Sequence, residues 1–324
     1  MAAGTSDFLS VLHILWEALH LPAKAGTLFL CLLLLTLLSS SLLFFSAYSI
    51  SPLVLDLVSK LAPLFRNPIG PEPPNLFHEI EKDLRDIASL ASGVALVFFF
   101  VSLFLMVATM YTFAMTYSNR NLSPKQLLLR VGRRWYQTLV TRLYVVLLTL
   151  GLALLSSLVI GTLMLVSHVP TVATAGVVSV LLYLYLSTRW CMSLVITVVE
   201  ETWGIGALSW SVELFIGNKT KGTILTLILK VVETAIYVAF GLALASPGPP
   251  GPPEAQMKLW CIVAAATAVW EIYAMAVYTV FYYECRKSHG LEEVMTVGGE
   301  YTVFYTGLPA AAAVAAGVKV EAIY

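Results

Sequence analysis

Charge is scarce in this sequence. Only 12% of its 324 residues are Asp, Glu, Lys or Arg, whereas 59% are hydrophobic, and the mean hydropathy is +0.85. Soluble domains carry about 25% charged residues. A soluble globule needs that charge to cover its surface, and a disordered chain needs more of it. The shortage therefore excludes both classes and favours an integral membrane protein.

Cysteine and histidine are also sparse. The four cysteines are far apart, with no CxxC pair or Cys/His cluster, which argues against a metal site or a disulfide framework. The five histidines are scattered, and no HExxH, GxSxG or Walker motif is present. Basic and acidic residues number 19 each, so net charge gives no argument for nucleic acid. We expect no metal, no cofactor, no nucleic-acid partner and no enzymatic activity.

Long apolar stretches are what the sequence has in quantity. Six of them are long enough to cross a bilayer core of about 30 Å. They are residues 26–49, 88–112, 140–166, 172–198, 223–246 and 258–283. The sequence predicts an all-α polytopic membrane domain over 1–283, with six transmembrane helices in three hairpins, and a cytoplasmic tail over 284–324.

The placement of Lys and Arg predicts the orientation. With both termini in the cytoplasm, twelve of these residues fall on the cytoplasmic side and five on the other side, and Arg189 and Lys230 lie within spans. Cytoplasmic loops are the ones enriched in Lys and Arg. We therefore expect cytoplasmic termini.

An amphipathic stretch precedes each odd-numbered span, which suggests a threefold repeat of one surface helix and one hairpin. Such helices lie at the headgroup boundary with their apolar side in the lipid. The apolar residues of the first stretch are Phe8, Leu9, Leu12, Leu15, Trp16 and Leu19. Those of the second are Leu127, Leu128, Val131 and Trp135, and those of the third are Leu208, Val212, Phe215 and Ile216. We expect all three as cytoplasmic interfacial helices.

Charged residues within spans are costly, so each is a candidate for function. Lys230 and Glu233 are three residues apart on one helix and can pair. Arg189 and Glu271, of opposite sign, then form a possible pair between helices. They can bind a lipid headgroup or relay an ion, or they can simply fix the helix register.

A basic stretch before the third span holds Arg130, Arg133 and Arg134. Cations at this place attract anionic lipid headgroups, by about 1 kcal/mol each. The same residues also serve as an ordinary positive-inside topology signal, and the two roles are compatible.

A specific resemblance begins in the fourth span. The residues that carry it are Arg189-Trp190, Val198-Val199-Glu200, Gly206-Ala207-Leu208, Ser211, Glu213-Leu214 and Gly217-Asn218. They resemble the membrane domain that is fused to some bacterial glycerophosphodiester phosphodiesterases. The chain is also similar to solitary six-span transmembrane proteins of plants. The resemblance implies a six-helix membrane domain with Glu200, Ser211 and Gly217 as motif residues, and an endoplasmic reticulum, endomembrane or plasma-membrane location. It does not imply phosphodiesterase activity, because catalysis in the fused proteins belongs to a separate soluble domain.

Two functions are compatible with these features. One is a non-enzymatic multipass protein that interacts with membrane lipids or acts as a scaffold, in membrane organisation or in stress or defence signalling, alone, as a homo-oligomer or with a membrane-protein partner. The other is a transporter or channel for a small polar or lipidic solute that uses Arg189 and Glu271. Solute flux after Glu271→Gln distinguishes them, because only a transporter would lose it.

Overall fold

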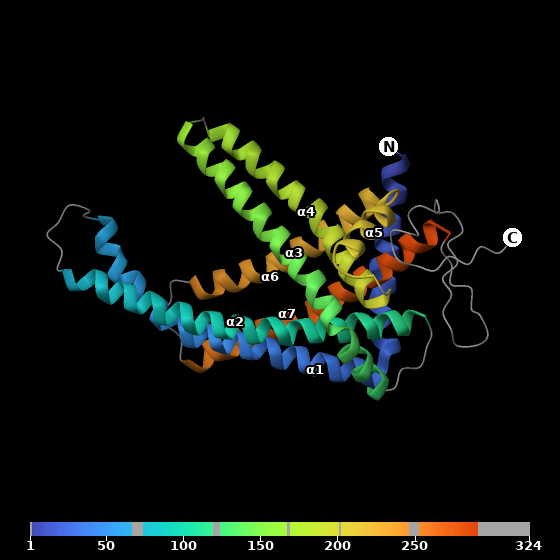
Figure 1. Cartoon of the computed structure of the whole chain (residues 1–324), viewed down its shortest axis with the longest axis horizontal. Coiled ribbons are helices and arrows are strands. Elements are labelled where there is room, and N and C mark those ends of the chain that lie inside the picture. Colours follow the sequence, from blue (N-terminus) through green and yellow to red (C-terminus); the bar gives the residue numbers. More distant parts are fainter. Residues whose placement is uncertain are drawn as a thin grey trace. The chain divides into compact units, whose positions relative to one another are not determined.

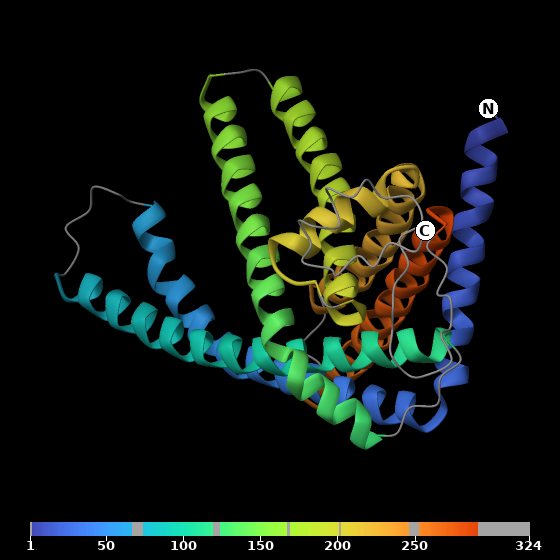
Figure 2. The same cartoon turned by 45° about the vertical axis from the view of Figure 1, so that its right-hand side comes forward.

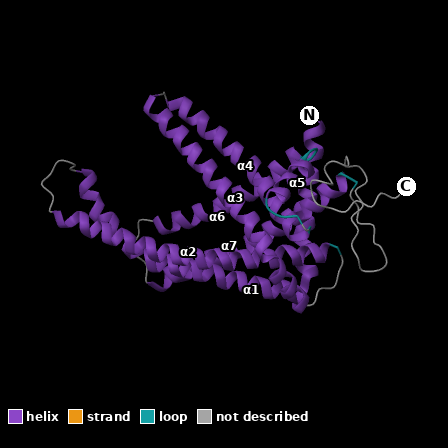
Figure 3. Ribbon diagram, in the orientation of Figure 1, coloured by secondary structure: helices purple, strands orange, loops and turns teal. Residues whose placement is uncertain are grey.

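The computed structural model describes residues 2–66, 74–118, 124–166, 169–200, 202–245 and 253–290. Every regular element in these ranges is an α-helix, which confirms the all-α prediction (Figure 3). In chain order the helices are α1 (Ala2–Arg66), α2 (Pro74–Tyr117), α3 (Pro124–Val166), α4 (Val169–Val199), α5 (Ile205–Phe215), α6 (Lys219–Ala245) and α7 (Pro253–Ser288) (Figure 1).

Six of these helices contain a stretch that is long and apolar enough to cross a bilayer. The stretches are Phe8–Ser46, Ile80–Tyr117, Trp135–Leu165, Pro170–Val199, Lys219–Ala243 and Met257–Ser288. The predicted number of spans is confirmed, and six such helices fit a multipass integral membrane protein. Helix α5 has only 11 residues and is too short to span. The predicted tail begins inside α7, and residues 291–324 lie outside the described part of the chain.

The second predicted surface helix is not separate from the span that follows it, and this prediction needs correction. Helix α3 joins the second stretch to the third span without interruption, since it contains no proline after Pro124. Helix α1, by contrast, consists of two helical segments joined by a kink at Gly26, where φ is +58° and the first predicted span begins. The third stretch forms a helix of its own, α5.

The first amphipathic stretch packs through the face opposite to its predicted apolar side. Its buried residues are Val11, Ile14, Ala18 and Leu21. The predicted apolar residues Phe8, Leu9, Leu12, Trp16 and Leu19 are exposed. In addition, the hydroxyl of Tyr273 on α7 donates a hydrogen bond to the carbonyl of Leu15, at 3.1 Å. This part of α1 therefore has a protein-facing side as well as a side suited to lipid.

The helices divide into two compact units. The first contains the described parts of residues 2–29, 107–234 and 272–290, and the second those of 30–106 and 235–271. The candidate site lies in the first unit.

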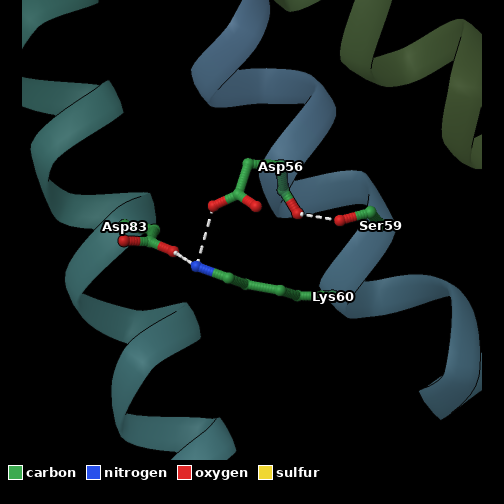
Figure 4. A network of polar contacts seen from close by, with 4 residues as sticks. All are labelled: Asp56, Ser59, Lys60 and Asp83. Carbon is green, nitrogen blue, oxygen red and sulfur yellow. Dashed lines mark hydrogen bonds and ion pairs between the residues drawn. The ribbon is translucent and has the colours of Figure 1, made fainter.

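In the second unit, a lysine joins the last turns of α1 to the first turns of α2 (Figure 4). The Lys60 ammonium lies 2.8 Å from an Asp56 carboxylate oxygen and 2.6 Å from one of Asp83. These hydrogen bonds, to Asp56 and then to Asp83, raise the pKa of Lys60 above its ordinary value. The cluster lies outside the spans, where exposed ion pairs contribute little stability.

In the first unit, α3 and α4 form a long antiparallel hairpin, with α5 packed against both (Figure 2). The core of this unit lies toward the C-terminal half of α4 and of α7, where Met192, Ile196 and Phe281 are almost completely buried. By contrast, no residue of α3 between 142 and 165 is buried. This outer half of the hairpin presents leucine and valine side chains on its surface, as a lipid-facing helix does.

Candidate functional site: a groove between α3, α4 and α5

An open groove of about 570 Å³ lies between α3, α4 and α5. This volume falls in the range of small-molecule sites in proteins, roughly 300–1,000 Å³. Its wall is formed by Leu147, Leu148, Gly151, Leu152, Leu155, Leu186, Arg189, Trp190, Ile205, Leu208, Ser209, Ser211 and Val212. Most of these side chains are apolar, and Arg189 is the single charged residue among them.

The groove exists because α5 folds back onto the hairpin. The turn before α5 is made by Gly204, whose φ of +63° favours glycine. Its backbone N–H donates to the Thr141 hydroxyl on α3 at 2.9 Å, and Thr141 also accepts a hydrogen bond from Thr197 of α4, at 3.1 Å. These bonds hold the start of α5 against both helices of the hairpin.

The other end of α5 is held by aromatic packing. Phe215 is almost completely buried, and its ring contacts those of Tyr185 on α4 and Phe281 on α7. Gly217, with φ of +95°, then reverses the chain into α6. The face of α5 that packs inward consists of Ala207, Ser211, Leu214 and Phe215. Of the predicted apolar residues, Val212 and Ile216 are exposed, whereas Phe215 packs against the protein.

Arg189 is half-buried in the groove wall. Its guanidinium carbon lies 5.8 Å from the centre of the Tyr185 ring, close enough for a cation–π contact. Within the part of the chain that the structure describes, no carboxylate forms an ion pair with it and no hydrogen bond reaches it. A cation at this depth without a counter-charge is costly unless a ligand supplies one.

The position of Arg189 along the hairpin fixes the direction of the groove. Arg189 lies 20 residues after the start of α4, and Leu147 lies 19 residues before the end of α3, so both are at a similar depth. Leu155 lies eight residues closer to the hairpin connection, which corresponds to about 12 Å of helix. The groove thus runs from Arg189 toward the connection, over about the depth of one leaflet.

A second polar feature of this unit is a hydroxyl network between α4, α6 and α7. The hydroxyls of Thr188 and Thr226 are 2.7 Å apart, and Thr226 is 3.2 Å from the Tyr278 hydroxyl. All three residues are buried. One helical turn farther along α6, the Lys230 ammonium donates to Glu233 at 2.7 Å. Because these groups bond to one another, the network satisfies itself and needs no ligand.

The third polar feature joins the end of α4 to α7. The Tyr282 hydroxyl donates to a Glu200 carboxylate oxygen at 2.6 Å, and the Arg286 guanidinium donates to that hydroxyl at 3.4 Å. Burial raises the pKa of Glu200, although Tyr282, Arg286 and Trp210 favour the charged form and partly offset this effect. Glu200 immediately precedes the turn into α5, so this cluster fixes the chain just before the groove wall.

The other residues singled out from the sequence are dispersed. Glu271 is exposed and belongs to the second unit, so its pairing with Arg189 stays a prediction. Arg133 is exposed on α3, whereas the side chains of Arg130 and Arg134 lie outside the described part. Of the motif residues, Ser211 is buried in α5 and donates to the Leu208 carbonyl at 2.7 Å.

Several residues of the site carry no signal in the sequence. Gly151 and Ser209 line the groove, but a glycine in a span and a serine in a short helix are ordinary. Tyr282 and Arg286 lie about 80 residues from Glu200 in the chain. Pairs of positions that co-vary in an alignment of relatives are the signal that reveals such contacts.

Residues 4–296 match the model of a family described as a domain of unknown function, DUF8558. The chain belongs to this family. The match covers the six apolar helices, α5 and the whole of the groove. No curated protein and no solved structure matches the chain.

Proposed function

We propose that this member of the DUF8558 family is a non-enzymatic, lipid-interacting membrane protein, and that its groove receives an acyl chain of a membrane lipid. The observation that carries the proposal is the groove itself: an open, leucine-rich channel on a hairpin whose outer half has no buried residue in α3. In a bilayer such a groove borders lipid, and an acyl chain that fills it makes van der Waals contacts that an unfilled groove would lack.

A substitution at Gly151 tests this proposal. Gly151 lines the groove, and a Cβ added to it meets no atom within 4 Å, so Gly151→Phe places a ring in the groove without a clash at the backbone. A ring that displaces part of the acyl chain removes roughly ten van der Waals contacts of about 0.1–0.2 kcal/mol each. We therefore expect roughly tenfold less retained lipid, measured by native mass spectrometry of the protein in mild detergent.

Gly161→Phe is the matched control. Gly161 is on the same helix, is equally open to an added Cβ and does not line the groove. It changes helix propensity and surface apolarity in the same way, so we expect it to retain lipid as the wild type does. Equal lipid retention by the two variants would overturn the proposed function.

We further propose that both termini face the cytoplasm, with Arg130, Arg133 and Arg134 near the headgroups of that leaflet. The twelve-to-five distribution of Lys and Arg supports this orientation. In sealed vesicles with the cytoplasmic side inward, an impermeant maleimide is expected to label Arg133→Cys only after permeabilisation. Lys60→Cys, on the opposite side, should react in intact vesicles. The reverse pattern would refute the orientation.

The resemblance to the membrane domains of bacterial glycerophosphodiester phosphodiesterases and to plant six-span proteins supports a proposed location in the endomembranes or the plasma membrane. A lipid-binding unit without a soluble catalytic domain also suits a scaffold that assembles with itself or with a membrane-protein partner. Co-purification in mild detergent tests this part, and recovery of the monomer alone would count against it.

A further inference from the structure

We propose that the groove selects an anionic phospholipid of the leaflet in which α4 ends, with the lipid phosphate on Arg189 and Ser209 and one acyl chain along α3 from Leu147 to Leu155. This inference rests on the proposed function and adds the chemical class of the ligand to it. The second acyl chain stays in the bilayer, because the groove is open along its side.

The positive charge of the groove favours a ligand with net negative charge. Arg189 is the single charged residue in the groove wall, and among the described residues it has neither an ion pair nor a hydrogen bond. A guanidinium is always protonated, so the groove carries one positive charge for which its own unit shows no counter-charge among the described residues. A lipid with net negative charge neutralises it, whereas a zwitterionic headgroup brings a cation of its own. Charge complementarity therefore favours the anionic lipid.

The depth of Arg189 in the membrane determines where a lipid phosphate meets it. The apolar stretch of α4 runs from Pro170 to Val199, and Arg189 lies between its middle and its C-terminal end. The distance from Arg189 to Val199 is ten residues, or about 15 Å of helix. The guanidinium lies beside the Tyr185 ring, one turn toward the start of α4, so a phosphate reaches it only when drawn inward from the headgroup level. The attached acyl chain then points toward the bilayer centre along the groove.

The groove wall also holds hydrogen-bond donors for a lipid phosphate. Guanidinium groups bind phosphate through two parallel N–H···O bonds, which are stronger than bonds between neutral groups. Ser209 is exposed and lines the same groove, so its hydroxyl can donate to a third phosphate oxygen. The neighbouring Ser211 hydroxyl already donates to the Leu208 carbonyl. The donors at this end of the groove are therefore Arg189 and Ser209.

Other cations of this unit, such as Lys230 and Arg286, are engaged elsewhere. Lys230 lies 2.7 Å from the Glu233 carboxylate. Arg286, beyond the groove, is buried beside Tyr282 and Glu200. This difference makes Arg189 the residue that an anionic ligand would recognise.

The test uses the full chain in nanodiscs that contain equal amounts of phosphatidylglycerol and phosphatidylcholine with identical acyl chains. After transfer to mild detergent, native mass spectrometry measures the ratio of the two retained lipids. We expect the wild type to prefer phosphatidylglycerol by roughly tenfold, as for a hydrogen bond to a charged group. Arg189→Gln should bind both lipids equally, Arg189→Lys should keep part of the preference, and Arg133→Gln should keep all of it.

The outcomes separate this inference from the proposed function. If Gly151→Phe loses both lipids and the wild type has no headgroup preference, the groove binds lipid but the inference is overturned. It is also overturned if Arg189→Gln keeps the preference, or if oleate displaces the bound lipid from the wild type and from Arg189→Gln equally well. If Gly151→Phe keeps both lipids, the proposed function fails. Ser209→Ala, a change on the groove surface, should lower the preference without affecting folding.

Discussion

Gly222→Val is expected to destabilise the protein by at least about 1–3 kcal/mol, the usual effect of overpacking a core. Gly222 lies in the first turn of α6, where α5 and α7 approach the backbone closely. A Cβ at this position would collide with the Phe215 ring and lie 2.8 Å from Phe281 Cζ. Both rings are buried and pack edge to face, with their centroids 6.5 Å apart, so neither can move without disturbing the other.

The same substitution is expected to affect the groove. Phe215 anchors the C-terminal end of α5, and α5 forms one wall of the groove. Displacing the ring should therefore shift α5 and weaken lipid retention together with thermal stability. This coupling illustrates why small residues are common where membrane helices meet: the absence of a side chain lets three elements come together.

Gly241→Ala is the control for this effect. Gly241 lies on the same helix, and a Cβ added there meets no atom within 4 Å. Alanine is a better helix former than glycine by about 1 kcal/mol, so this variant should melt at or above the wild-type temperature. Gly222→Ala gains the same propensity and should still melt lower. Scanning fluorimetry in detergent measures both, and a Gly222→Ala variant as stable as Gly241→Ala would contradict the packing argument.

Hydropathy was sufficient to predict the helical class and the six spans. The bilayer imposes a length and an apolar composition on every span, and both are local properties of the sequence. The helix ends were harder to predict, because charged or amphipathic segments continued the helices past the apolar stretches. In α3 the residues from Lys125 to Gln137 are polar enough to suggest a separate surface helix, yet nothing in them ends the helix.

The groove could not have been predicted from the sequence. Arg189 was singled out by its position within a span, but its surroundings depend on how α5 folds back. That reversal requires the hydrogen bond from Gly204 to Thr141, two residues that are 63 positions apart in the chain. The partner proposed for Arg189 was Glu271, since opposite charges invite pairing. That pairing stays a prediction, because the two residues belong to different units; within its own unit, no described carboxylate forms an ion pair with Arg189.

The polar groups of the first unit thus fall into two kinds. Those between α4, α6 and α7 bond to one another, as the hydroxyls of Thr188, Thr226 and Tyr278 do, and they fix the packing of the helices. Arg189 faces an open, otherwise uncharged groove. This contrast is the reason to assign structure to the first kind and ligand binding to the second.

Glu200 is expected to make the protein less stable as the pH rises. Burial raises the pKa of this carboxyl in the folded protein above its ordinary value of about 4.3. At a pH between the ordinary pKa and the raised pKa, the folded state keeps the proton on Glu200 whereas the unfolded state has lost it. The contribution of Glu200 to the free energy of unfolding is therefore largest when the pH is at or below the ordinary pKa of glutamate. It falls as the pH rises toward the pKa in the folded protein, by up to about 1.4 kcal/mol per pH unit.

Glu200→Gln separates this effect from all other titrations. The amide keeps the shape of the side chain and stays neutral, so Glu200→Gln should lack this fall. The stability difference between the wild type and the variant at each pH should therefore isolate the contribution of Glu200. Glu213→Gln, an exposed carboxylate on α5, should leave the pH profile of the wild type unchanged. Melting temperatures in detergent from about pH 4.3 upward measure all three proteins. A wild type that gains stability relative to Glu200→Gln over this range would show that Tyr282 and Arg286 stabilise the carboxylate more than its burial disfavours it.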